Sequence, residues 1–200
     1  IPGSANPLLL APAGGGYQVQ RSLRFNSSDS GFLSRTPAVE GNRQTWTWAG
    51  WVKRSAISSA ATQIIFDAFS GTGSNYFLFQ IRSSDVIQIF FGPSIGELIT
   101  TPVYRDASAW YHMVLAYDTT QATPANRVRL YVNNVEVNTF STATYPSQNN
   151  ANNYVNSTVP HHIGAGYTTP VTEFFNGYLA ECYLIDGQQL TPSSFVEVSA

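Results

Sequence analysis

The chain has 200 residues, of which 43% are hydrophobic, 14% aromatic and 11% charged, enough for one domain with a buried core and too apolar for an intrinsically disordered protein. Serine, threonine and asparagine are abundant and lysine occurs once, so the composition favours strands and loops over helices. The formal net charge is -2 and no group of Lys or Arg exceeds a local pair, which excludes nucleic acid as a partner.

The first residues differ in pattern from the rest of the chain. Three prolines and a glycine triplet in residues 1–16 predict an extended arm, followed by a domain over residues 17–200. Leu8, Leu9 and Leu10 form an apolar patch that we expect to dock, either on a neighbour or along its own domain. This run is too short for a signal peptide, and no stretch is long enough for membrane insertion. Because the chain does not begin with Met, we expect a processed chain or a fragment.

From residue 17 onward, hydrophobic and polar residues alternate with a period of two, which indicates β-strands. The strand-like runs are 18–25, 45–53, 63–69, 76–82, 86–91, 98–104, 110–118, 127–132, 135–140 and 175–185. The first run, followed by Phe32 and Leu33 after a polar turn, predicts an opening hairpin.

Turn residues connect several of these runs. Residues 83–85 join two runs as a hairpin, and Asn133 and Asn134 suit the positive φ values of a type I′ turn. Residues 191–195 predict about one helical turn, and residues 145–158 form the longest polar stretch without a strand. The pattern predicts an all-β fold, a two-sheet antiparallel jelly-roll sandwich with an extended N-terminal arm.

Four motifs in this order resemble the laminin G-like and pentraxin-like domains of the concanavalin A-type jelly roll. They are Ser22–Asn26 with Gly31–Leu33, then Trp46–Lys53, then Trp110–Asp118 with Arg129–Asn134, and finally Phe175–Cys182. The resemblance covers about residues 20–197. It implies a lectin-type domain in which Trp46, Trp48 and Trp110 belong to the core.

Residues 1–10, 31–37 and 185–195 resemble more narrowly the fibre or appendage proteins of tailed phages of marine bacteria. This resemblance implies a non-enzymatic virion structural protein, assembled in the host cytoplasm and forming a homo-oligomer. Its expected partners are other virion proteins and a host-surface glycan, and its chain is expected to continue past Ala200. The alternative is a secreted carbohydrate-binding laminin G-like module.

Related jelly rolls include glucanases, whose chemistry requires two carboxyl groups on one strand face about 5 to 5.5 Å apart. The twelve acidic residues here never stand two positions apart. Glu181 and Asp186 are the nearest pair, and their odd spacing places them on opposite faces of a regular strand. We therefore predict no catalytic residues and no enzymatic activity, although a degenerate glucanase stays a third hypothesis.

The sequence also contains few residues that suit a metal site or thiol chemistry. His161 and His162 are adjacent and face opposite ways in a strand, so with His112 they predict no zinc site. Many relatives bind calcium, and Asp29, Asp118 and Asp186 are the oxygen donors available here, although Ala180 stands where the family often has an acidic residue. We predict no cofactor and leave calcium open. Cys182 is the single cysteine and reads as a small buried hydrophobe.

Glycan binding needs an exposed aromatic face for sugar C–H groups and amides or carboxylates for hydroxyls. The long polar loop and its surroundings supply both. The candidate glycan- or partner-binding residues are Tyr145, Asn149, Asn150, Asn152, Tyr154, His161 and Tyr167. The alternative is a solvated loop whose tyrosines cover a sheet edge.

Overall fold

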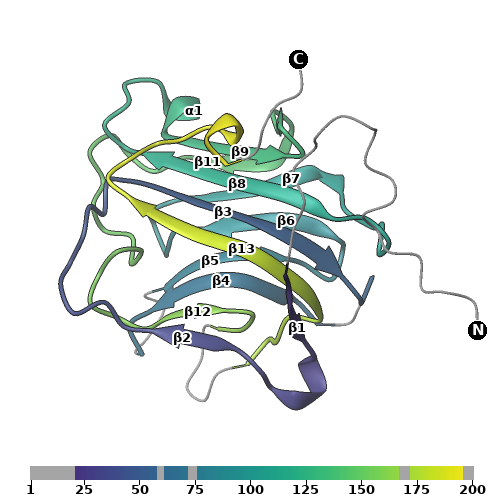
Figure 1. The fold of residues 1–200 in the computed structure, drawn as a ribbon. Helices are drawn as coiled ribbons and strands as arrows, with labels where there is room; N and C mark the ends of the chain where they lie inside the picture. The colour runs from purple at the N-terminus through teal and green to yellow at the C-terminus, as the bar shows by residue number, and fades with distance from the viewer. Residues whose placement is uncertain (1–20, 58–60, 72–75, 167–171, 196–200) are drawn as a thin grey trace, which may run out of the picture.

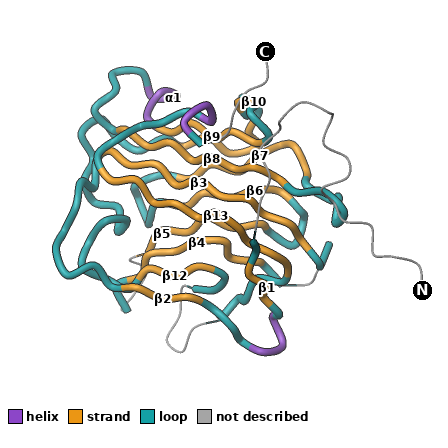
Figure 2. The backbone as a smooth tube through the Cα atoms, in the orientation of Figure 1, coloured by secondary structure: helices purple, strands orange, loops and turns teal. Residues whose placement is uncertain are grey.

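A computed structural model describes residues 21–57, 61–71, 76–166 and 172–195. These residues form two antiparallel sheets of six and seven strands, stacked face to face as a sandwich (Figures 1 and 2). The predicted all-β, two-sheet antiparallel jelly roll is therefore confirmed. The predicted arm and its Leu8, Leu9 and Leu10 lie outside the described residues.

The six-stranded sheet has the order β1 (Leu23–Phe25), β13 (Gly177–Asp186), β3 (Thr45–Arg54), β8 (Tyr111–Asp118), β9 (Val128–Val132) and β10 (Val135–Glu136). The seven-stranded sheet has the order β11 (Phe140–Thr144), β7 (Glu97–Val103), β6 (Val86–Phe90), β5 (Tyr76–Ile81), β4 (Gln63–Phe69), β12 (His161–Ile163) and β2 (Leu33–Arg35). Three single turns of helix complete the described elements: η2 (Ser27–Asp29), α1 (Pro124–Arg127) and η3 (Pro192–Ser194).

Aromatic rings fill the space between the sheets. Trp46 stacks on Tyr117 with ring centroids 4.8 Å apart, and Trp48 meets Phe79 edge-on at 5.1 Å. Both tryptophans are buried as predicted, because alternate residues of β3 point to the same face. The core prediction for Trp110 is wrong. It precedes β8 and is only half-buried.

Two turn predictions are confirmed. β5 and β6 pair through a turn that ends at Asp85, which has φ 66. Asn133 and Asn134 have φ values of 51 and 67 and connect β9 to β10. Asparagine tolerates this left-handed region better than most residues with a side chain.

The opening hairpin prediction is wrong. β1 pairs with β13, whereas β2 pairs with β12 in the other sheet. Between them Asn26 caps η2, and Ser30, with φ 52, ends it, so the chain passes from one sheet to the other. Alternation along a strand does not reveal which strand becomes its partner.

The run 135–140 also divides between the sheets. β10 ends at Glu136 beside β9, and β11 begins at Phe140 beside Thr100 of β7. The pattern missed β12, η2 and α1, because each is too short to show a period. Within the described part of the chain, no helix is long and apolar enough to cross a membrane.

A bulge in β13 sets the geometry of one end of the sandwich. Ala180 lies opposite Trp51 and Tyr183 opposite Ala49, so one extra residue is accommodated near Glu181, which has φ 50. After the bulge, Cys182 and Leu184 pack against the core, in agreement with the hydrophobic interpretation of Cys182. Burial raises the pKa of the Cys182 thiol to about 12.

Candidate functional site

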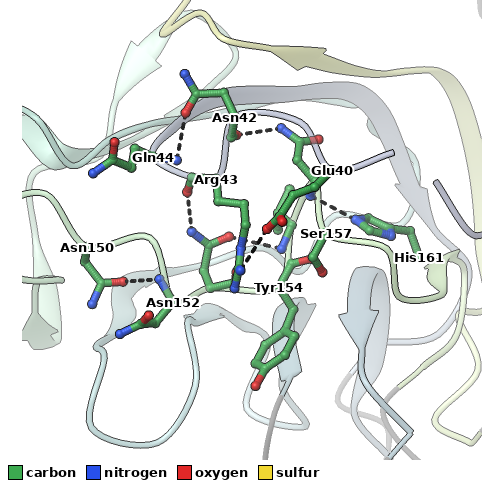
Figure 3. Close-up of polar contacts among 12 residues, drawn as sticks. Glu40, Asn42, Arg43, Gln44, Asn150, Asn152, Tyr154, Ser157 and His161 are labelled. Carbon is green, nitrogen blue, oxygen red and sulfur yellow. Dashed lines mark hydrogen bonds and ion pairs between the residues drawn. The ribbon is translucent and has the colours of Figure 1, made fainter. Parts of the chain in front are cut away.

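The polar loop that follows β11 folds against residues 40–44, the segment that leads into β3 (Figure 3). Arg43 joins the two segments, because its Nε and Nη2 donate to the carbonyl oxygen of Asn153 at 2.9 and 2.7 Å. Asn153 Nδ2 donates back to the carbonyl oxygen of Arg43 at 2.5 Å. Gln44 Nε2 donates to the carbonyl oxygen of Asn149 at 2.7 Å. These bonds hold the loop in one conformation.

A second set of bonds, here called the Asp186 latch, consists of Asn42, Asn156 and Asp186. Asp186 Oδ1 accepts from the backbone N–H of Asn42 at 2.7 Å and from Asn156 Nδ2 at 3.0 Å. Asn156 Nδ2 also donates to the carbonyl oxygen of Asn42 at 2.9 Å. The latch fixes both loop segments to the end of β13.

His161 extends the latch toward β12. Its Nε2 accepts from the backbone N–H of Asn156 at 3.1 Å, so its neutral ring carries the proton on Nδ1, which lies 2.7 Å from the carbonyl oxygen of Val159. Burial is the main cause that lowers the pKa of His161. His162 faces the other way, with Nδ1 2.6 Å from Asp67 Oδ1. The prediction that these histidines diverge is confirmed.

The seven candidate residues divide by what their side chains do. Asn150 is structural, because its Oδ1 accepts from the backbone N–H of Asn152. His161 is buried in the same framework. The side-chain amides of Asn149 and Asn152 are exposed and make no hydrogen bond with the described residues.

The tyrosines also differ. The Tyr154 ring packs partly on the core with the Arg43 guanidinium 5.9 Å from its centroid, and its hydroxyl bonds to no described residue. Tyr145 is half-buried against the core, and burial raises the pKa of its hydroxyl. Tyr167 lies outside the described residues.

Sequence reasoning missed Glu40, Asn42 and Arg43 as members of the site. Glu40 forms an ion pair with Arg43 Nη1 at 2.8 Å, and its side chain is 51% exposed. This segment lies about a hundred residues before the loop in the chain, and no local pattern in the sequence indicates their contact.

A pocket of about 500 Å³ opens beside the Asp186 latch, between β13 of one sheet and β2 and β12 of the other. Its floor includes the buried side chains of Trp48 and Phe66, and its rim includes Leu33 and Val39. Asn156 and Asp186 of the latch line the pocket, together with His161. The pocket is thus mostly apolar, whereas the loop surface beside it is polar.

The acidic residues considered for catalysis or calcium are separated in the fold. Glu181 occupies the bulge, so the regular-strand spacing used for the pair does not apply, and Asp186 is held in its latch. Asp118 accepts hydrogen bonds from Thr45, Thr120 and Gln121 on its two carboxylate oxygens. Asp29 accepts from Asn26 and Ser28.

Across the described ranges, no group of three or more His, Cys, Asp or Glu side chains lies in a position to hold a metal ion. The carboxylates that the family resemblance offered for calcium instead accept hydrogen bonds from neighbouring protein groups. These residues do not fit a calcium site of several carboxylate ligands.

Comparison with known proteins places this geometry in context. A family model described as "Concanavalin A-like lectin/glucanases superfamily" matches residues 26–193. No protein with a curated description matches the chain in sequence.

Three solved structures illustrate the likeness in fold. The CBM40 domain of the Ruminococcus gnavus IT-sialidase has a TM-score of 0.56 at 15% identity, covering 81% of this chain and 95% of that domain. A heptameric SAP-like pentraxin from Limulus polyphemus has a TM-score of 0.55 at 14% identity, covering 85% of this chain and 77% of its own. Domains LG4-5 of the mouse laminin alpha1 chain have a TM-score of 0.56 at 12% identity, covering 93% of this chain and 46% of theirs. At these identities the likeness concerns the fold.

Proposed function

The chain belongs to the concanavalin A-like lectin/glucanases superfamily, whose model spans residues 26–193, and from this premise we propose that it is a non-enzymatic glycan-binding domain. The binding surface is the loop described above, and its contacting groups are Glu40, Asn149, Asn152 and Tyr154. A structure of the CBM40 domain in complex with alpha2,3 sialyllactose shows that a chain of similar fold binds an oligosaccharide.

The strongest support for this proposal is that different side chains of the loop hold its backbone and face the solvent. Arg43, Asn153 and Asn156 use their side chains to hold the backbone, whereas the amides of Asn149 and Asn152 have no partner among the described residues. A loop that is already ordered loses little conformational entropy when a ligand binds. Free amides can donate to and accept from sugar hydroxyls at the same time.

Tyr154 supplies the apolar part of the surface. Its ring packs partly on the core, and the guanidinium carbon of Arg43 lies 5.9 Å from the ring centroid. A fixed aromatic ring offers a sugar C–H face a packing surface at low entropic cost. The exposed carboxylate of Glu40 adds an acceptor for hydroxyl protons.

A printed array of neutral and acidic oligosaccharides tests the proposal, followed by calorimetry with the strongest hit. We expect Asn152→Ala to weaken binding about three- to tenfold, as for the loss of one or two hydrogen bonds. Tyr154→Ala should weaken it more. Asn138→Ala, at an exposed asparagine in the connection between β10 and β11, is the matched control. Equal affinity in the Asn152 variant and the control would contradict the assignment of the surface.

The absence of catalysis is part of the same proposal and has its own test. The latch role of Asp186 supports it, because this carboxylate already accepts hydrogen bonds from Asn42 and Asn156. We expect no release of reducing sugar from a panel of β-glucans. Turnover that is abolished by Glu181→Gln would establish the glucanase hypothesis instead.

We propose further that the domain is displayed on a phage particle as a homo-oligomer, with other virion proteins as partners. The resemblance of residues 31–37 and 185–195 to phage appendage proteins supports the location, and the heptameric state of the Limulus pentraxin supports the oligomer, because a chain of similar fold forms a homo-oligomer there. Mass spectrometry of purified virions should detect the chain. Its recovery from secreted material alone would favour the carbohydrate-binding module.

A further inference from the structure

Arg43 lies among the proposed contact groups, but its positive charge is already paired (Figure 3). Its Nε and Nη2 donate to the carbonyl oxygen of Asn153, and its Nη1 forms the 2.8 Å ion pair with Glu40. The Arg43 side chain is 26% exposed and that of Glu40 is 51% exposed. The negative partner is therefore the more accessible charge of this pair.

Arg127, the last residue of α1, is used in the same way. Its Nε, Nη1 and Nη2 donate to the carbonyl oxygens of Gln121, Pro146 and Ala122 at 2.8, 2.9 and 2.7 Å. These bonds tie the start of the loop to the segment before α1. Each guanidinium nitrogen of Arg127 thus has an acceptor within the protein, as each nitrogen of Arg43 does.

His161 and Arg35 are paired across β12 and β2 beside the loop. Burial, the main cause, lowers the pKa of His161 below 6.5, and its Nε2 accepts from the N–H of Asn156, so the ring is neutral at pH 7. Arg35 is exposed and lines the mostly apolar pocket. We therefore assign Arg35 to the pocket and not to the loop surface.

Carboxylates also lie around the loop surface. Glu40 belongs to the contact groups, and the exposed Asp186 holds the latch through Oδ1. Asp118 precedes Thr119, whose carbonyl oxygen accepts from the backbone N–H of Asn149. The loop surface is thus bordered by negative charge, whereas its arginine nitrogens are engaged.

From these charges we infer that the loop surface selects uncharged glycans and rejects glycans that carry a carboxylate or a sulfate. The inference rests on the proposed function and names the class of sugar for the same site. An anion that leaves water needs N–H donors or a cation in place of its hydration. The amides of Asn149 and Asn152 supply N–H groups, but Glu40 in the same contact set repels an anion.

Sugar hydroxyls suit these groups better. The Glu40 carboxylate can accept a hydrogen bond from a hydroxyl, and a bond to an ionised acceptor is stronger than one between neutral groups. The same carboxylate thus favours an uncharged sugar and disfavours an acidic one. Glu40 is the residue that determines this specificity.

The test compares uncharged trisaccharides of glucose, galactose and mannose with their uronic-acid counterparts, in which a carboxylate replaces the C6 hydroxymethyl group. Both forms are printed on an array, and calorimetry with the full chain measures each pair that binds. We expect the uncharged form to bind at least about tenfold more tightly, as for one contact between like charges near a protein surface. This ratio should fall about threefold in about 0.5 M NaCl, because salt screens the repulsion.

Glu40→Gln removes the charge but keeps an oxygen that can accept from Arg43 Nη1, so in this variant the ratio should approach one. Asp106→Asn is the matched control. Asp106 is an exposed carboxylate whose backbone N–H donates to the hydroxyl of Tyr111, at the end of β8 that lies opposite Val52 and far from Thr45. The control should keep the ratio of the native chain.

Equal or tighter binding of the acidic forms would overturn the inference and leave glycan binding established. If Arg35→Gln then abolished that binding, Arg35 would be the residue that holds the anion. An unchanged ratio in Glu40→Gln would also overturn the inference, because the discrimination would not come from this carboxylate. Absence of binding to both forms of every pair would contradict the proposed function itself, and the inference with it.

Discussion

Asparagine side chains have two different tasks in the loop after β11. Asn150, Asn153 and Asn156 bond to backbone groups and fix its shape, whereas Asn149 and Asn152 present free amides. The sequence alone nominated Asn149, Asn150 and Asn152 without distinguishing the two tasks, because the amide chemistry is the same in both. The tasks of Asn153 and Asn156 depend on backbone groups of Arg43 and Asn42, which come from a distant part of the chain.

The buried histidine in this framework predicts a pH dependence of stability. Burial, the largest cause, lowers the pKa of His161 below its ordinary value of 6.5. As the pH falls below 6.5, the unfolded chain binds a proton at this residue more readily than the folded chain does, so folding stability decreases. Protonation would also remove the acceptor that Nε2 offers to the N–H of Asn156.

Thermal melting at a series of pH values from about 7 to 5 measures this effect. We expect the melting temperature of the native chain to fall with pH more steeply than that of His161→Gln. Some slope should remain in the variant, because burial also lowers the pKa of His112. Identical slopes in the two proteins would exclude His161 as a source of the pH dependence.

Among the elements, β13 contributes most to the position of the site. Its bulge near Glu181 redirects Cys182 and Leu184 to the core and brings Asp186 to the latch. The sequence pattern predicted a strand over this region, but a period-two pattern assumes regular pairing. The bulge lies opposite Gly50 of β3, where the Trp48 ring and Cys182 Sγ occupy the space that a side chain at Gly50 would need.

Gly50→Ala tests this arrangement of the two strands. A Cβ atom at this position would lie 2.8 Å from the Trp48 ring and 3.2 Å from Cys182 Sγ. Overpacking of this kind typically costs about 1 to 3 kcal/mol, so the urea midpoint should fall. Gly31→Ala is the control, because nothing lies within 4 Å of its Cβ position. Equal midpoints in the two variants would contradict the close packing.

For the whole molecule, contacts between distant residues hold the two sheets in place. β13 crosses the front of the fold between β1 and β3, two strands from the other end of the chain (Figure 1). The pocket between the two sheets opens where the edges of β2 and β13 lie. Function is therefore proposed at one side of the sandwich, where a polar loop surface and an apolar pocket lie together.

Stability of the whole domain is expected to be independent of calcium. The carboxylates of Asp29, Asp118 and Asp186 accept hydrogen bonds from neighbouring protein groups and do not gather into a ligand set. An ion that binds only the native state raises the melting temperature by mass action. We therefore expect equal melting temperatures in millimolar calcium and in EDTA, and a higher value in calcium would contradict this expectation.

The sequence by itself determined the fold class, most strand positions, two turns and the identity of the polar loop. It did so because alternation, turn residues and composition act over a few neighbouring positions. Only the tertiary structure decided that β1 and β2 join different sheets, that residues 135–140 divide, and that Arg43 and Asp186 hold the loop. These features depend on which distant segments of the chain contact each other. Such contacts do not change the local spacing of hydrophobic and polar residues, so the sequence pattern does not predict them.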